Sequence, residues 1–228
     1  MPDPVFLITG ASSGIGAATA RRAAEPGYRL VLAARSKDKL DTLAEELGGP
    51  DVALAVACDV TDFAQQEAMV AAGLEHFGRI DVVWANAGFG AKRGFLEETP
   101  EHWRDMVLTN VLGAAYTIRA AIPALKDTTG HLLLTSSVAG RRVIPGSLYS
   151  ATKHAVTAMA EAVRQELNGT GVRVTSIEPG MVDTPFFEKT PEGALEPDDI
   201  ARAVMYAISQ PSHVDVNEIL VRPTAQPL

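Results

Sequence analysis

The chain has 228 residues, of which 46% are hydrophobic and 21% charged, a composition typical of one globular domain. Its net charge of −8 argues against nucleic acid as the main partner, and its single cysteine excludes an intrachain disulfide and a cysteine metal cluster. No segment approaches the roughly 18 unbroken apolar residues of a membrane helix, and residues 1–4 do not resemble the start of a signal peptide. We therefore expect a cytoplasmic protein with no membrane span and no metal site.

Short apolar runs alternate with longer stretches of helical spacing from one end of the chain to the other. Continuous apolar runs are typical of parallel strands that are buried on both faces, and the helices between them predict right-handed crossovers. We predict a single α/β domain over residues 1–228, with a doubly wound parallel sheet of about seven strands. Such sheets bind ligands at the carboxyl ends of their strands. The predicted strands are residues 4–9, 29–34, 52–58, 81–85, 131–136, 172–177 and 218–221.

A glycine-rich turn, TGASSGIG at residues 9–16, follows the first predicted strand and opens the first predicted helix. Glycines allow a tight turn and let the backbone approach a pyrophosphate, while the helix N-terminus offers unpaired N–H groups and the positive end of its dipole. A plain glycine-rich connection is the alternative. We predict a dinucleotide phosphate site made by Gly10, Ser12, Ser13, Gly14, Ile15 and Gly16.

The end of the second predicted strand distinguishes between the two nicotinamide dinucleotides. An acidic residue there binds the ribose 2′-hydroxyl of NAD, whereas an arginine accommodates the 2′-phosphate of NADP. This strand ends in Arg35, and no aspartate or glutamate follows until Asp38. We therefore predict NADP(H) as the cofactor, with Arg35 at the 2′-phosphate. Lys37 and Lys39 are expected to be solvated.

Tyr149 and Lys153 lie four residues apart in a helix that we predict over residues 147–167, bounded by Pro145-Gly146 and Asn168-Gly169. Side chains at this spacing share one face of a helix. A free tyrosine has a pKa near 10, and a nearby ammonium group is expected to lower it toward a value useful for acid–base catalysis. The alternative is a surface pair with no function.

Together, the glycine turn and Tyr149-Ser150-Ala151-Thr152-Lys153 resemble the T-G-x-x-x-G-x-G and Y-x-x-x-K motifs of the short-chain dehydrogenase/reductase family. The resemblance covers essentially the whole chain and implies a Rossmann-like fold with a nicotinamide cofactor. It implies that Lys153 also binds the nicotinamide ribose and that Asn110 holds a water in a proton relay. The further cofactor-binding residues it implies are Asp59 and Val60, Asn86, Ala87 and Gly88, and Pro179, Gly180, Val182 and Thr184, together with Tyr149 and Lys153.

A serine is expected to polarise the substrate carbonyl, and Ser136 and Ser137 are both available at the end of the fifth predicted strand. Alignment with the family's S-x-x-G pattern selects Ser137, whereas the commoner spacing to Tyr149 selects Ser136. Neighbouring residues on a strand point to opposite faces, so one of the two faces the site. We favour Ser137.

The expected activity is NADP(H)-dependent reduction of a small to medium ketone or aldehyde, or oxidation of a secondary alcohol, with Tyr149 as the acid/base. Two alternatives are a 3-hydroxy acid dehydrogenase of the same family and a non-catalytic dinucleotide-binding sensor. A nucleotide-sugar epimerase or dehydratase is disfavoured because little chain follows Pro179. The family is commonly dimeric or tetrameric, so we expect a homodimer or homotetramer.

Residues 180–196 are expected to form a mobile lid over the substrate, because irregular loops of this length are usually functional or mobile. Met181, Phe186 and Phe187 give this segment an apolar side; the alternative places the two phenylalanines in the core. Phe89 and Ile144 are candidates for the opposite wall.

Arg141 and Arg142 are two further candidates, because a substrate carboxylate would suit them. Solvated arginines are the favoured interpretation, and we assign neither a site role.

Overall fold

The fold is built on one sheet of seven parallel strands in the order β3-β2-β1-β4-β5-β6-β7, seen in a computed structural model that describes residues 3–92, 94–144, 147–187, 189 and 191–226. The doubly wound sheet predicted from the alternating pattern is confirmed. All seven strands lie within one or two residues of their predicted bounds. They are β1 (Val5–Thr9), β2 (Arg29–Ala34), β3 (Ala53–Ala57), β4 (Val82–Ala85), β5 (His131–Thr135), β6 (Arg173–Pro179) and β7 (Glu218–Val221).

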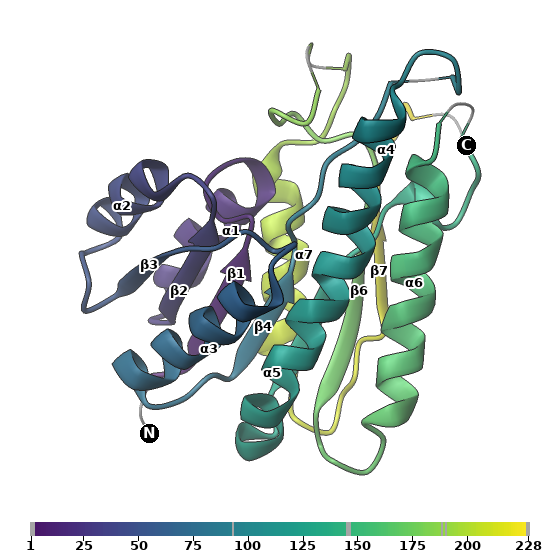
Figure 1. Cartoon of the computed structure of the whole chain (residues 1–228). Helices are drawn as coiled ribbons and strands as arrows, with labels where there is room; N and C mark the ends of the chain where they lie inside the picture. Colours follow the sequence, from purple (N-terminus) through teal and green to yellow (C-terminus); the bar gives the residue numbers. More distant parts are fainter. Residues whose placement is uncertain (1–2, 93, 145–146, 188, 190, 227–228) are drawn as a thin grey trace.

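Helices cover both faces of the sheet (Figure 1). One face packs against α1 (Gly14–Ala24), α2 (Lys37–Glu46) and α7 (Pro197–Ser209), and the other against α3 (Phe63–Phe77), α5 (Ala114–Thr128) and α6 (Tyr149–Glu166). The remaining helical segments are α4 (Pro100–Val107), the π-helix η1 (Leu108–Gly113) and the 3₁₀ turn η2 (Val138–Gly140). Both faces of the sheet are therefore buried under helices, as the continuous apolar runs predicted.

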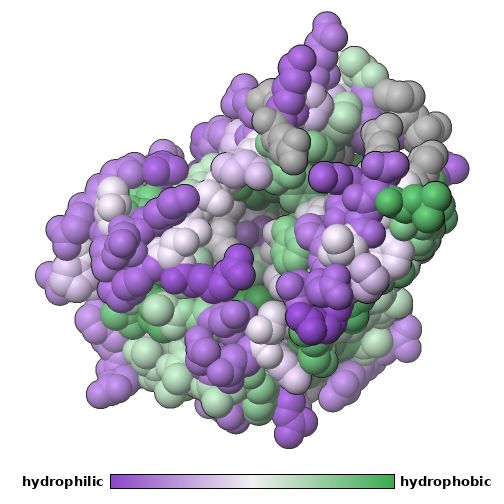
Figure 2. Space-filling model, turned by 45° about the horizontal axis from the view of Figure 1, so that its top comes forward, coloured by the Kyte–Doolittle hydropathy of each residue, from purple (hydrophilic) through white to green (hydrophobic). Residues whose placement is uncertain are grey.

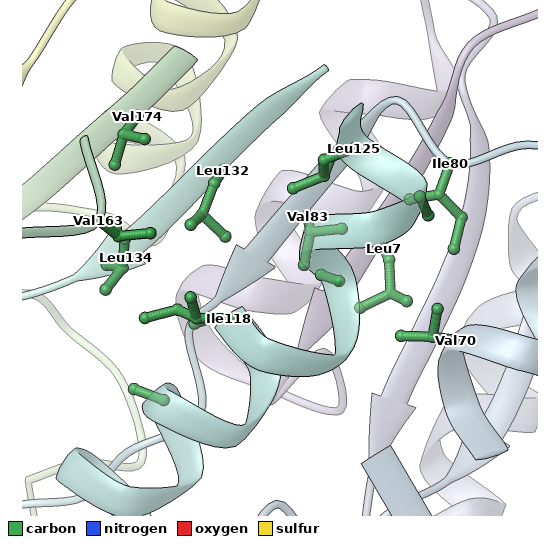
Figure 3. Close-up of a cluster of buried hydrophobic side chains, with 14 of the residues drawn as sticks. Leu7, Val70, Ile80, Val83, Ile118, Leu125, Leu132, Leu134, Val163 and Val174 are labelled. Atoms are coloured by element: carbon green, nitrogen blue, oxygen red, sulfur yellow. The ribbon is translucent and has the colours of Figure 1, made fainter. Parts of the chain in front are cut away.

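The core on the α3, α5 and α6 side shows how alternate strand residues divide between the two faces. Leu7, Val83 and Leu132 point from neighbouring strands toward Ile118 of α5 (Figure 3). Their sequence neighbours Phe6, Trp84 and Leu133 belong to the core on the opposite face. Period-two alternation within an all-apolar run thus fills two separate cores.

Two element boundaries differ from the predictions by two residues, the largest differences found. Strand β6 continues to Pro179 because it pairs with β7 there, and Gly180 N donates to Val221 O at 2.7 Å. Helix α6 begins at Tyr149 rather than at residue 147, because Ser147 has a φ of 46° that no helix residue adopts. The predicted boundary Pro145-Gly146 lies outside the described residues.

The strand order reverses between β1 and β4, because the chain crosses to β2 and β3 on one side and to β5, β6 and β7 on the other. Such a switch point leaves a crevice beyond the carboxyl ends of the strands, where doubly wound folds bind ligands. The surface is hollowed near the centre of this face (Figure 2). Within the described part of the chain, no helix has the length and apolar character needed to cross a membrane.

Candidate active site

The glycine turn after β1 leaves the N-terminus of α1 open to a ligand. Ser13, the residue that precedes the helix, makes no capping hydrogen bond with its side chain, and the first turn of the helix carries no acidic residue. Its backbone N–H groups are therefore available to an anion. A β-carbon added to Gly16 would lie 2.4 Å from Gly10 O, and Gly14 has a φ of 52°. Both positions therefore favour glycine.

Asn86, Ala87 and Gly88 follow β4 and border the same crevice. Asn86 joins three strand ends, because its side chain donates to Thr9 O and accepts from Thr135 Oγ1, each at 3.0 Å. A β-carbon on Gly10 would lie 2.9 Å from Ala87 Cα, so the glycine turn and this segment are in close contact.

Three of the other predicted cofactor residues, Arg35, Asp59 and Val60, lie just beyond the carboxyl ends of β2 and β3. Asp59 Oδ1 accepts from the backbone N and the hydroxyl of Thr61, and Val60 is buried. Arg35 is exposed just beyond β2, and the structure shows no ion pair for it among the described residues. Lys37 pairs with Asp41, so it is held away from a ligand role.

A cavity of about 230 Å³ lies next to the glycine turn, between α1 and α2. Ser12 and Lys39 both line it, and Lys39 has no hydrogen-bond or ion-pair partner in the described part of the chain. Ser12 of the glycine turn and Lys39 of α2 thus border the same cavity.

Tyr149 and Lys153 lie together on the first turn of α6, with Lys153 Nζ 5.8 Å from the centre of the Tyr149 ring. Lys153 is 4% exposed and donates to Thr135 O at 2.9 Å. Burial lowers the pKa of Lys153 to about 8. Burial also raises the pKa of Tyr149 to about 12, and a hydrogen bond with Ser137 offsets part of this rise. The expectation that Lys153 lowers the tyrosine pKa is therefore wrong for this structure, because desolvation of the phenol dominates.

The two serines after β5 have different surroundings. Ser136 is buried, and its hydroxyl bonds to Lys153 O at 3.0 Å and to Thr157 Oγ1 at 2.6 Å. The Ser137 hydroxyl donates to Pro179 O at 3.3 Å and accepts from Ala139 N at 3.1 Å, and it lies close enough to the phenol to lower the pKa of Tyr149. The structure thus brings Ser137 to the phenol and turns Ser136 toward the backbone of α6.

Asn110 lies in the π-helix η1, which interrupts the helical run between α4 and α5. Its amide bonds to both backbone groups of Phe89 and to Thr152 Oγ1, at 2.9–3.2 Å. A β-carbon on Gly88 would lie 3.0 Å from Asn110 Oδ1 and 3.5 Å from Lys153 Nζ. Asn110 therefore lies behind Lys153, and π-helical turns often mark functional positions.

The segment after β6 reaches across the crevice to the glycine turn. Val182 forms an isolated bridge with Leu195, which closes the base of the predicted lid. Thr184 lies against Gly14, since a β-carbon there would be 3.1 Å from Thr184 Cγ2. Pro179 and Gly180 connect this segment to β6, and Pro179 O is the acceptor for Ser137.

Phe186 of this segment covers the tyrosine. Its ring lies 5.6 Å from the ring of Tyr149 and 5.0 Å from that of Phe187, and it contacts the backbone of Gly90. Phe186 is 40% exposed, and neither phenylalanine belongs to a core cluster of the described residues. The interpretation that buries them in the core is therefore not supported. Glu188 of the same segment lies outside the described residues.

A cavity of about 570 Å³ opens under this segment. Its described lining does not include Phe89, whose ring packs against His102 at 5.2 Å, or Ile144. The described residues that line this cavity come from the segment after β4 and from the lid segment. They are Ala91, Lys92, Met181, Phe187, Lys189, Pro191 and Glu192.

Arg141 has a structural role that the sequence did not reveal. It forms ion pairs with Glu178 at 2.7 Å and with Glu218, and Ser176 Oγ donates to the other carboxylate oxygen of Glu178 at 3.0 Å. The Glu178 side chain is 1% exposed, and the hydrogen bonds to the two carboxylates raise the pKa of Arg141 further. Arg141 is thus engaged by protein carboxylates, whereas Arg142 has no ion pair among the described residues.

Comparison with known proteins decides the family. The family model described as short chain dehydrogenase matches residues 4–194. The chain belongs to the short-chain dehydrogenase/reductase family. This confirms the resemblance inferred from the glycine turn and the Tyr149–Lys153 pair, and it makes the protein an oxidoreductase. Among the described residues of this dehydrogenase/reductase, no cluster of histidine, cysteine, aspartate and glutamate is arranged to hold a metal ion.

Relatives and solved structures cover almost the whole chain. It is 42% identical to an uncharacterised oxidoreductase of Staphylococcus haemolyticus, over 96% of each chain. Among solved structures, it is similar to an alcohol dehydrogenase from the archaeon Thermococcus sibiricus complexed with 5-hydroxy-NADP (38% identity, TM-score 0.92, 99% and 98% of the chains). It is also similar to serine dehydrogenase from Escherichia coli (32% identity, TM-score 0.89, 98% and 100% of the chains).

Sequence reasoning missed several residues that organise the site of this dehydrogenase/reductase. Thr135 accepts from Lys153, Thr152 accepts from Asn110, and Glu178 holds Arg141. Threonines at strand ends and on helices are too common to be singled out from one sequence. Glu178 directly follows the predicted strand 172–177 and is buried because β6 continues to Pro179, so its burial was not evident from the predicted bounds.

Proposed function

We propose that this protein is an NADP(H)-dependent carbonyl reductase, or an alcohol dehydrogenase in the reverse direction, with Tyr149 as the acid/base. The observation that carries the proposal is the convergence of Ser137, Tyr149 and Lys153 beside an uncapped helix N-terminus. A protein that only binds dinucleotides has no need of a phenol held by a serine and a buried lysine. The sensor alternative is therefore disfavoured. Turnover of NADPH with a panel of ketones and aldehydes is the direct test.

The residues divide the chemistry among themselves. When bound, the nicotinamide cofactor supplies or accepts the hydride, and the protein handles the proton. Ser137 donates a hydrogen bond to the substrate carbonyl, and Tyr149 gives its proton to the oxygen as negative charge develops there. Lys153, whose Nζ lies 5.8 Å from the centre of the Tyr149 ring, would return a proton to the phenol with the help of Asn110. General acid catalysis of this kind contributes about 10²- to 10⁴-fold.

The residues present fit a dinucleotide. Gly10, Gly14 and Gly16 leave the backbone of the turn bare where side chains would clash, and the N-terminus of α1 has no capping side chain. Arg35 and Lys39, both exposed and without protein partners in the described chain, support a 2′-phosphate beside them. The complex of the Thermococcus sibiricus enzyme with 5-hydroxy-NADP also favours NADP over NAD.

Arg35→Asp is expected to move the preference from NADP(H) toward NAD(H). The new carboxylate would repel a 2′-phosphate and accept from a 2′-hydroxyl, so the affinity ratio should change by roughly one to two decades. Kd values for NADPH and NADH from nucleotide fluorescence measure this directly. Arg35→Lys, which keeps the positive charge, is the matched control and should still prefer NADPH. An unchanged ratio in the aspartate variant would show that another residue binds the phosphate.

The rate of carbonyl reduction is expected to fall above about pH 8. Tyr149, with its pKa of about 12, stays protonated and able to donate throughout the neutral and mildly alkaline range. Lys153, with its pKa of about 8, loses its positive charge as the pH rises through that value. Above this pH the lysine has no proton to return to Tyr149, so the rate of reduction falls. The measurement is kcat/KM for a neutral ketone between about pH 6 and pH 10 with saturating NADPH.

Lys153→Arg is the control for this profile. A guanidinium group keeps its charge across the whole range, so any residual activity of this variant should show no decline near pH 8. A wild-type profile that stays level up to pH 10 would rule out the role given to Lys153.

A further inference from the structure

The cavity of about 570 Å³ under the lid segment is lined by both apolar and charged side chains. Met181, Phe187 and Pro191 supply apolar surface, whereas Lys92 and Lys189 supply two ammonium groups. The two lysines come from different parts of the fold, because Lys92 follows β4 and Lys189 belongs to the segment after β6. Their meeting at one cavity is a product of the tertiary structure.

Neither lysine is neutralised by a protein group that the structure describes. The side chains of Lys92 and Lys189 have no ion pair or hydrogen bond in the described part of the chain. Several other basic residues of the chain are paired with carboxylates, among them Arg21, Arg22 and Arg141. The chain has a net charge of −8, yet two lysines without carboxylate partners line one cavity, so an anionic ligand could bind there.

Two phenylalanines link the lining of the cavity to Tyr149 by ring contacts. Phe187 lines the cavity and packs against Phe186 at 5.0 Å, and Phe186 packs against Tyr149 at 5.6 Å. A substrate whose carbonyl lies at Tyr149 can therefore extend along the aromatic surface toward the lysines. The end of such a substrate remote from the carbonyl would meet positive charge.

We propose that Lys92 and Lys189 form an anion subsite, and that the physiological substrate is an oxo acid whose carboxylate binds there while its ketone lies at Tyr149. The inference rests on the proposed carbonyl reductase function. Glu192 lines the same cavity, so its described lining residues carry the net charge of one cation, which matches a monoanion better than a phosphate dianion. Arg141 is excluded from this role because Glu178 and Glu218 already engage it.

Matched substrate pairs test the subsite. The keto acids 3-oxobutanoate, 4-oxopentanoate and 5-oxohexanoate are compared with their methyl esters, which keep the ketone and remove the charge. For the acid of the right length, kcat/KM is expected to exceed that of its ester by one to two decades, because a charge-assisted contact replaces a neutral one. High salt should reduce this preference, since exposed charges are screened.

Three variants give the sign of the effect. Lys92→Met and Lys189→Met should each lower the ratio of acid to ester kcat/KM by about tenfold, mainly through the KM of the acid. Glu192→Gln should raise the same ratio, because it removes a repulsive charge. Lys126→Met, at an exposed lysine in the last turn of α5, is the matched control and should leave the ratio unchanged.

The outcomes separate this inference from the function on which it rests. If the esters are reduced as well as the acids, and neither lysine variant changes the ratio, the subsite is overturned and the reductase function stands. If a keto phosphate monoester is preferred over every keto acid, the carboxylate assignment is wrong. If NADPH binds but neither acids, esters nor simple ketones are reduced, the reductase function itself fails.

Discussion

Tyr149→Phe is expected to lower kcat by about a thousandfold or more while leaving the affinity for NADPH within a factor of about two. Among the described residues, this phenol is the group that bonds to Ser137 beside buried Lys153, so its loss removes the proton donor. General acid catalysis accounts for about 10²- to 10⁴-fold in rate, and phenylalanine fills the same volume. Single-turnover oxidation of NADPH with excess ketone measures the chemical step, and nucleotide fluorescence measures binding.

The neighbouring serines provide the internal control. Ser137→Ala should lower kcat by roughly one to three decades, because it removes a hydrogen bond made to the developing oxyanion. Ser136→Ala should act mainly on stability, since the Ser136 hydroxyl bonds to Lys153 O and Thr157. A kcat of Tyr149→Phe within tenfold of wild type would show that Tyr149 is not the proton donor. A larger kinetic loss in Ser136→Ala than in Ser137→Ala would reverse the choice of serine.

Arg141→Met is expected to destabilise the protein by about 3–5 kcal/mol, because it leaves the buried carboxylate of Glu178 without its ionic partner. For a chain of this size, such a change corresponds to a fall in Tm of roughly 6–20 °C. Glu178 immediately precedes Pro179, whose carbonyl accepts from Ser137, so kcat should fall as well. Chemical denaturation gives the free energy of unfolding, and calorimetry gives Tm.

Two further variants separate the buried charge from the loss of an arginine. Arg142→Met, at the exposed neighbour, should change the free energy of unfolding by less than about 0.5 kcal/mol. Combining Arg141→Met with Glu178→Leu should recover much of the lost stability, because the pair is then replaced by apolar groups. A single Arg141→Met variant as stable as wild type would show that Glu178 does not need this partner.

The fold could be predicted from the sequence because its signals are local. Seven apolar runs, each long enough for a buried strand, alternate with helical spacing, and right-handed crossovers leave few arrangements for such a chain. The errors lie at boundaries that tertiary pairing decides. β6 reaches Pro179 because β7 pairs with it, although these strands are far apart in the sequence.

The pairing of chemistry-bearing residues could be predicted only where they are close in sequence. Gly10, Gly14 and Gly16 form one turn, and Tyr149 and Lys153 share one helical turn, so spacing alone indicates their geometry. The π-helical turn that places Asn110 behind Lys153 could not be predicted, because it depends on the packing of α4 and α5 rather than on any residue pattern.

The sequence by itself therefore determined the strand–helix alternation, the glycine turn and the tyrosine–lysine pair, since backbone periodicity and short-range spacing define them. The tertiary structure alone decided that Arg141 pairs with Glu178, that Ser137 rather than Ser136 meets the phenol, and that Lys92 and Lys189 share a cavity. It also decided the protonation of the site, because desolvation raises the pKa of Tyr149 and lowers that of Lys153. Burial and charge pairing depend on what the rest of the chain brings to a residue, and spacing along the chain does not contain that information.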